Sequence, residues 1–136
     1  MPSIFVIKER LENPKEWYDK AMGNKEEWVY DSIQKLYHAG SVYLIERENE
    51  TAFDDFAETE FFGWSTENWR KLAGEKELVY GYYNDDAMEA EYVHIKDGVC
   101  VREYSEYEGE VDTDEGTEPE FENWISVASY VDRELL

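Results

Sequence analysis

The sequence predicts an α+β fold, in which an antiparallel β-meander over about residues 77–107 packs with N-terminal helices and a C-terminal helix. Three observations support this. Residues 77–107 are rich in β-branched and aromatic side chains, an Asp-Gly turn divides them, and the segments on either side carry helix caps and helical spacing. At 136 residues, with 16% aromatic residues, the chain is expected to form one domain over 1–136, because disordered chains contain few aromatics.

The first elements are short. Ile4–Ile7 is a β-branched run that fits either an edge strand or the start of a helix. Asn13-Pro14 is typical of a helix start, with Asn as N-cap and Pro at the first helical position, and Gly23 is expected to end this helix.

A second N-terminal helix is expected between Asn24 and Gly40. Asn24 followed by Glu27 resembles a capping box, and Gly40 is a typical C-terminal stop. The apolar residues between them recur at helical spacing. These residues are Trp28, Val29, Ile33, Leu36 and Tyr37.

The middle of the chain is less regular. Val42–Ile45 is expected to be a strand, and Thr51–Phe62 fits no single period. Ser65 and Thr66 can cap a short helix over Asn68–Leu72, with a glycine after it.

The predicted meander has three strands, Leu78–Tyr83, Met88–Ile95 and Val99–Tyr107. Asn84–Asp86 forms the first turn. Asp97-Gly98 forms the second, a two-residue hairpin turn that is the strongest local signal in the chain. We expect helix residues to pack on its inner face, namely Trp28, Ile33, Leu36, Trp124, Ile125 and Ala128.

After the meander, Gly109–Thr117 is expected to be an acidic loop, and Pro119 is expected to start the C-terminal helix. The buried stripe of this helix is predicted to be Phe121, Trp124, Ile125, Ala128 and Val131.

The charge is unevenly distributed. Residues 1–47 hold 8 acidic and 7 basic side chains, whereas residues 48–136 hold 26 acidic and 6 basic ones. Between Arg102 and Arg133 there is no Lys or Arg. Like charges at this density raise the energy of the compact state, so a gain in stability does not explain the excess of acidic residues. Solubility or binding to a basic partner would explain it. The same charge disfavours direct binding to nucleic acid and to anionic lipid.

No catalytic motif is recognisable, so we expect a protein that is not an enzyme and needs no cofactor. His38, at the end of the predicted second helix, and His94, on a strand, have no His or Cys at ligand spacing, so no zinc site is expected. Cys100 is expected to be a structural thiol in a reducing environment, because acidic neighbours raise a thiol pKa. The chain has no signal-peptide pattern and no long apolar run, so a cytoplasmic, non-membrane protein is expected.

The acidic segment Asp112–Gly116 is a candidate calcium loop. It departs from the EF-hand pattern at the fifth, sixth and twelfth positions, where Gly116, Thr117 and Asn123 stand. Three interpretations stay open for it: a solvated loop, a loop that contacts a partner, or a weak site for a divalent ion.

Aromatic residues interleaved with acids mark two candidate binding segments. In one interpretation, each ring faces the core and each acid faces water. In the other, the segments form a binding face, because tyrosine and tryptophan anchor interfaces and carboxylates speed the capture of a cationic partner. The first segment contributes Asp54, Asp55, Glu58 and Glu60, and the second contributes Tyr104, Glu106, Tyr107, Glu108, Glu110, Asp112, Asp114 and Glu115.

The segment from Tyr92 to Tyr130, including Val-His-Ile-Lys-Asp-Gly-Val-Cys-Val-Arg-Glu-Tyr and Asp-Thr-Asp-Glu-Gly, resembles small acidic bacterial immunity proteins of polymorphic or contact-dependent toxin systems. The resemblance implies a stoichiometric protein that binds and blocks a basic, nuclease-like cognate toxin. Two alternatives stay open: a nucleic-acid mimic that occupies a DNA-binding protein, and a small ligand-binding or enzymatic domain with an aromatic pocket.

Overall fold

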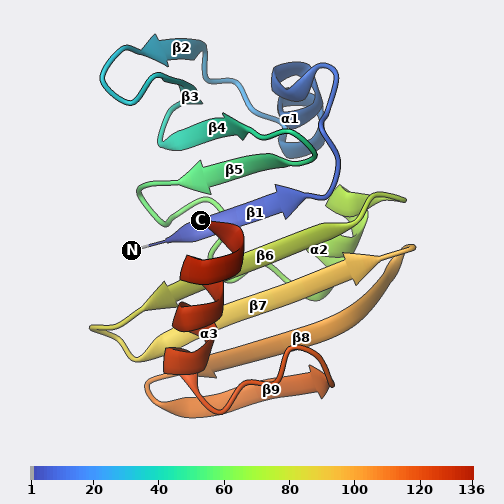
Figure 1. The fold of residues 1–136 in the computed structure, drawn as a ribbon, viewed down its shortest axis with the longest axis vertical. Coiled ribbons are helices and arrows are strands. Elements are labelled where there is room, and N and C mark those ends of the chain that lie inside the picture. Colours follow the sequence, from blue (N-terminus) through green and yellow to red (C-terminus); the bar gives the residue numbers. More distant parts are fainter. Residues whose placement is uncertain (1) are drawn as a thin grey trace.

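One antiparallel sheet of nine strands organises the chain, in the order β2-β3-β4-β5-β1-β6-β7-β8-β9 (Figure 1). The computed structural model describes residues 2–136. The strands are β1 (Ser3–Ile7), β2 (Trp28–Asp31), β3 (Leu36–Ala39), β4 (Val42–Glu46), β5 (Thr51–Asp55), β6 (Leu78–Asn84), β7 (Glu89–Lys96), β8 (Val99–Tyr107) and β9 (Glu110–Gly116). The helices are α1 (Pro14–Met22), α2 (Thr66–Ala73), α3 (Trp124–Tyr130) and η1 (Val131–Leu135), a π-helical continuation of α3.

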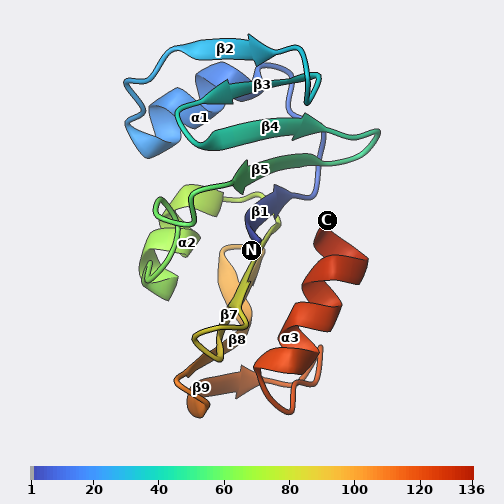
Figure 2. The same ribbon diagram turned by 90° about the vertical axis from the view of Figure 1, so that its left-hand side faces the viewer.

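The helices cover both faces of this sheet. Figure 2 shows α1 and α2 on one side and α3 on the other. Phe5 and Trp69 belong to the buried cluster on the first side, and Tyr92 and Val131 belong to the cluster on the second. The expected α+β fold is therefore confirmed.

The predicted meander is also confirmed, as β6, β7 and β8. Asp97 and Gly98 both have positive φ, 53° and 75°. Positive φ at both central residues is the geometry of a two-residue turn whose twist matches that of the flanking strands. The Asp-Gly dipeptide therefore determines the β7–β8 connection locally.

The run Ile4–Ile7 forms most of β1, which lies at the centre of the sheet between β5 and β6, rather than at an edge or in a helix. Phe5 and Ile7 are buried on the α1 side, and Ile4 and Val6 are buried on the α3 side. A strand with both faces covered has a continuous apolar sequence, which explains why the run lacks alternation.

The predicted helix over residues 24–40 is wrong, because this segment is the β2–β3 hairpin. The Asp31 carboxylate accepts bonds from the backbone N–H groups of Ile33 and Gln34, which stabilises a turn. Trp28 reaches back to the end of α1, where its indole N–H donates to Asp19 at 2.9 Å. Ile33, expected in the core, is 87% exposed at the tip of the hairpin. His38 consequently lies on β3 and not at a helix end.

The first and third predicted helices are confirmed as α1 and α2. Gly23 ends α1 in the left-handed conformation. The Ser65 side chain caps α2 by accepting a bond from the N–H of Asn68.

The expected acidic loop over residues 109–117 is wrong, since it contains β9, which pairs with β8. The C-terminal helix starts at Trp124 rather than at Pro119, and Asn123 caps it. Its first turn presents Ile125 to solvent, so this residue does not belong to the buried stripe. The buried residues of α3 and η1 are Val127, Val131 and Leu135.

Candidate functional site: an acidic surface with aromatic side chains

The fold places the loop after β5, which carries Glu58 and Glu60, beside Tyr107 of the second predicted segment. The loop after β5 lies over the end of the meander, where the ring of Phe62 lies 4.9 Å from that of Tyr82 and 6.3 Å from that of Tyr107. Phe62 is exposed, and Tyr107 is half-buried. Segments that are distant in the sequence therefore share one face, on the side of the sheet that also carries α2.

Beneath these rings, the buried carboxylate of Glu91 connects three parts of the chain. Its Oε1 accepts a bond from the Tyr80 hydroxyl at 2.8 Å and from the N–H of Gly63 at 3.1 Å. Its Oε2 accepts a bond from the Tyr107 hydroxyl. The loop, β6 and β8 are thus joined through one side chain on β7. The sequence analysis did not identify Glu91, because an acid on a strand gives no signal of burial.

The tyrosines of this surface are held as neutral donors. Burial, followed by the bond to Glu91, raises the pKa of Tyr107 above its usual range. Burial and the bond from the Tyr82 hydroxyl to Glu89, at 2.5 Å, do the same for Tyr82. Half-buried Tyr107 can therefore contact a partner without its side chain being newly ordered, which lowers the entropic cost of binding, whereas Tyr82 is 3% exposed and supports the surface from below.

The acidic part of the surface is the β8–β9 hairpin and β9 itself. Its exposed carboxylates are Glu108, Glu110, Asp112, Asp114 and Glu115. No Lys or Arg follows before Arg133, and Arg102, the preceding one, is 2% exposed. The negative charge of this hairpin is therefore not offset by an exposed neighbouring cation along residues 103–132.

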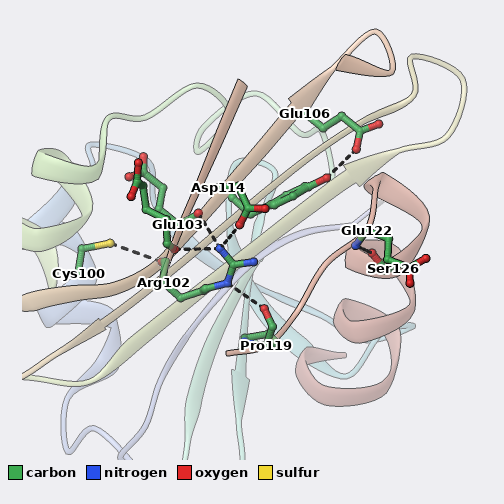
Figure 3. A network of polar contacts seen from close by, with 10 residues as sticks. Cys100, Arg102, Glu103, Glu106, Asp114, Pro119, Glu122 and Ser126 are labelled. Carbon is green, nitrogen blue, oxygen red and sulfur yellow. Dashed lines mark hydrogen bonds and ion pairs between the residues drawn. The ribbon is translucent and has the colours of Figure 1, made fainter. Parts of the chain in front are cut away.

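Arg102 organises the inner side of this region (Figure 3). Its guanidinium donates to the carbonyl oxygens of Pro119 and Glu115, both at 2.8 Å, and to the carboxylate of Asp114 at 2.7 Å. It also lies 5.2 Å from the centroid of the Phe121 ring. One arginine thus holds β9 and the segment before α3 against the sheet, and Asp114 serves the fold as well as the surface.

Three of the predicted contact residues are internal and do not contribute to an exposed surface. Asp55 is buried and accepts bonds from Ser41 and from backbone N–H groups of residues 57, 59 and 60, so it shapes the loop after β5. Tyr104 and Glu106 are buried and bond to each other at 2.8 Å.

The remaining residues of the first segment are divided between the two sides of the sheet. Asp54 is half-buried and follows Phe53, which packs on the α1 side, so it faces the opposite side. Burial and the nearby charge of Asp55 raise its pKa to about 6. Glu60 is exposed, and Glu58 acts electrostatically on Tyr82, so both belong to the acidic surface.

His94 and Cys100 both bond to neighbouring groups of the fold. The imidazole of His94 contacts Glu77 at 2.7 Å. The Cys100 thiol is half-buried, and burial together with Glu103 raises its pKa, which disfavours the thiolate. Among residues 2–136, no group of three or more His, Cys, Asp and Glu side chains is placed to hold a metal ion. In the described chain, no helix is long and apolar enough to span a membrane.

The largest aromatic cluster forms the core instead of lining a pocket. Phe5 lies within 5.0 Å of both Phe53 and Phe61, and Trp69 stacks on Tyr80 at 4.3 Å. All five rings are buried. Rings that fill space against one another leave no room between them for a ligand.

Comparison with protein-family models, with curated proteins and with solved structures found no match for this chain. The functional interpretation therefore depends on the surface itself.

Proposed function

We propose that this chain is a stoichiometric binding protein that neutralises a basic, nuclease-like toxin in the bacterial cytoplasm, as an immunity protein does, without any catalysis of its own. One observation carries the proposal: Phe62 and Tyr107, from two distant segments, lie on one face beside exposed Glu110, which pairs with Tyr107 across the β8–β9 ladder. Aromatic anchors supply affinity, and carboxylates around them steer a cationic partner into place.

The test compares two charge-reversal variants in capture from cells of the source organism. The first, E108K/E110K/D112K, alters the β8–β9 hairpin and spares Asp114, because reversal there would place a cation beside buried Arg102. The control, E12K/E27K/E48K, makes the same change in net charge at exposed residues of the N-terminal half.

Wild type and control are expected to retain the same basic protein, and the hairpin variant is expected to lose it. Because exposed charges are screened beyond about 8 Å at physiological salt, added salt should slow association far more than it speeds dissociation. Equal retention by both variants, or a captured protein whose toxicity this chain does not suppress on co-expression, would reject the proposal.

A nucleic-acid mimic is the second candidate, supported by the extended conformation of β9. Alternate residues of a strand lie about 6.6 Å apart, so β9 holds its carboxylates at short intervals along an extended backbone, with a bulge at Asp112 that places Glu110 and Asp114 on opposite faces. A mimic would be displaced from its partner by double-stranded DNA and would capture a DNA-binding protein that is not toxic. These two outcomes separate it from an immunity protein.

A further inference from the structure

We propose that the outer edge of β9 takes up an extended, cationic segment of the partner as an additional strand of the sheet. This inference rests on the proposed function and specifies how its partner binds. Strand addition depends on the main-chain N–H and C=O groups of an unpaired strand edge. The carboxylates of β9 determine only which kind of segment can pair with that edge.

The outer edge of β9 has unused hydrogen-bonding capacity. The strand is seven residues long and ends the sheet, and within residues 2–136 its ladder partner is β8 alone. The backbone–backbone bonds in turns, loops and caps involve none of residues 110–116, and the Arg102 side chain bonds to the carbonyl of Glu115 near the end of the strand. An edge strand presents alternate N–H and C=O groups outward, and such a row is a template for another strand. In β9 this row continues on both sides of a bulge at Asp112.

The charge on β9 selects the occupant. Natural proteins protect edges with charged side chains, and like charges placed opposite each other on adjacent strands are destabilising. The exposed acids Glu110, Asp112, Asp114 and Glu115 therefore prevent a second copy of this chain from pairing through the same edge. They favour a strand that carries Lys or Arg. Val111, 51% exposed, offers an apolar contact beside them.

The opposite edge of the sheet lacks this combination. β2 has four residues and a single acid, Asp31. A cationic strand would gain fewer backbone bonds there and little electrostatic attraction. The two edges of one molecule therefore provide an internal comparison, in which only β9 should respond to a cationic probe.

The experiment uses the full chain and an acetylated eight-residue peptide in which Lys alternates with Val and Thr. A second peptide is N-methylated on every other backbone amide, which leaves one hydrogen-bonding edge intact, and a third is N-methylated on all of them. All three keep the same charges. Affinity is measured by fluorescence anisotropy, and amide hydrogen exchange of the protein is followed by NMR.

The unmodified peptide is expected to bind and to protect amides of residues 110–116. The half-methylated peptide should bind with an affinity within about threefold of that of the unmodified peptide, because an added strand uses only one of its two edges. The fully methylated peptide should bind at least about tenfold more weakly, because main-chain hydrogen bonds supply the affinity. Equal binding of all three peptides, protection at β2 instead of β9, or no binding would each overturn the inference. If E108K/E110K/D112K still loses the captured toxin in those cases, the proposed function stands and only this mode of binding fails.

Discussion

At the scale of single residues, the structure depends on two buried charged groups, Glu91 and Arg102, and on the groups that bond to them. Glu91 accepts bonds from two tyrosine hydroxyls and one backbone N–H. Arg102 donates to three backbone carbonyls and to Asp114. Removing one member of such a group leaves the others desolvated and unpaired, which costs more free energy than the intact interaction contributes.

Substitution of Glu91 by Ala should lower the free energy of unfolding by about 2–4 kcal/mol, because the hydroxyls of Tyr80 and Tyr107 lose their acceptor. Urea unfolding followed by tryptophan fluorescence measures the change. Exposed Glu110 on β9 is the control, and E110A should change stability by less than about 0.5 kcal/mol. Similar effects of the two substitutions would show that Glu91 does not hold the loop to the sheet.

Asp54 should make stability fall as the pH rises. Burial and Asp55 raise the pKa of its carboxyl from 3.8 to about 6 in the folded protein, so the unfolded chain releases its proton first. The contribution of protonated Asp54 is therefore fully present below about pH 4 and is lost between pH 4 and 6.

The variant D54N, which cannot ionise, should gain stability relative to wild type over this interval, by about 1–2 kcal/mol. Urea titrations of both proteins at pH 4 and pH 7 measure the difference. A difference that does not depend on pH would contradict the raised pKa.

At the scale of elements, the C-terminal helix lies close to the sheet because β6 has a glycine beneath it. A Cβ added at Gly81 would lie 2.6 Å from Cγ2 of Val131 and 2.7 Å from Cδ1 of Leu135. Real Cβ atoms do not approach other atoms so closely, so the position of η1 depends on the missing side chain. No comparable constraint is visible in the sequence, where Gly-Tyr-Tyr only interrupts an aromatic strand.

The variant G81A should therefore destabilise the protein by about 1–3 kcal/mol through overpacking, and V131A should do so through a cavity. In the double variant the added methyl group occupies space that Val131 vacates. The combined loss should be smaller than the sum of the single losses by at least about 1 kcal/mol. Denaturant unfolding of all four proteins gives this coupling. Additive losses would mean that η1 does not rest on Gly81.

At the scale of the whole molecule, negative charge is concentrated toward one end of the sheet. β9 and the segment that follows lie at the opposite end from β2 and β3, which belong to the nearly neutral N-terminal part of the chain (Figure 1). A distribution of this kind creates a field that orients an approaching cation before contact. It also raises the energy of the folded state through repulsion within the acidic end.

Added NaCl should consequently stabilise the wild-type protein, because salt screens this repulsion. Urea unfolding at about 0.05 M and 0.5 M NaCl should show a rise of about 1 kcal/mol or more for wild type. The rise should be clearly smaller for E108K/E110K/D112K, in which the repulsion is relieved. Because general salting-out affects both proteins alike, the difference between them isolates the electrostatic part. Equal increases would contradict it.

Local signals in the sequence were sufficient to predict the features that depend on neighbouring residues. Asp97-Gly98 predicts the β7–β8 turn because only a few dipeptides tolerate two positive φ values. Ser65 marks the start of α2 and Gly23 marks the end of α1, in each case through hydrogen bonds within one helical turn. The α+β class followed from these signals. Composition also determined that the acids of the C-terminal half have almost no basic neighbours.

Features that depend on distant residues could not be predicted from local signals, because they require contacts across the chain. The segment 24–40 has helical spacing, yet it forms a hairpin whose Trp28 bonds to α1 and whose β3 pairs with β4. The sequence of segment 109–117 is typical of a loop, yet most of it forms a strand because its backbone pairs with that of β8. The candidate surface arose in the same way, because Phe62 and Tyr107 come from distant segments that Glu91 joins through its hydrogen bonds. Backbone pairing and burial across the chain outweigh local propensity, since propensities differ by less than about 1 kcal/mol per residue.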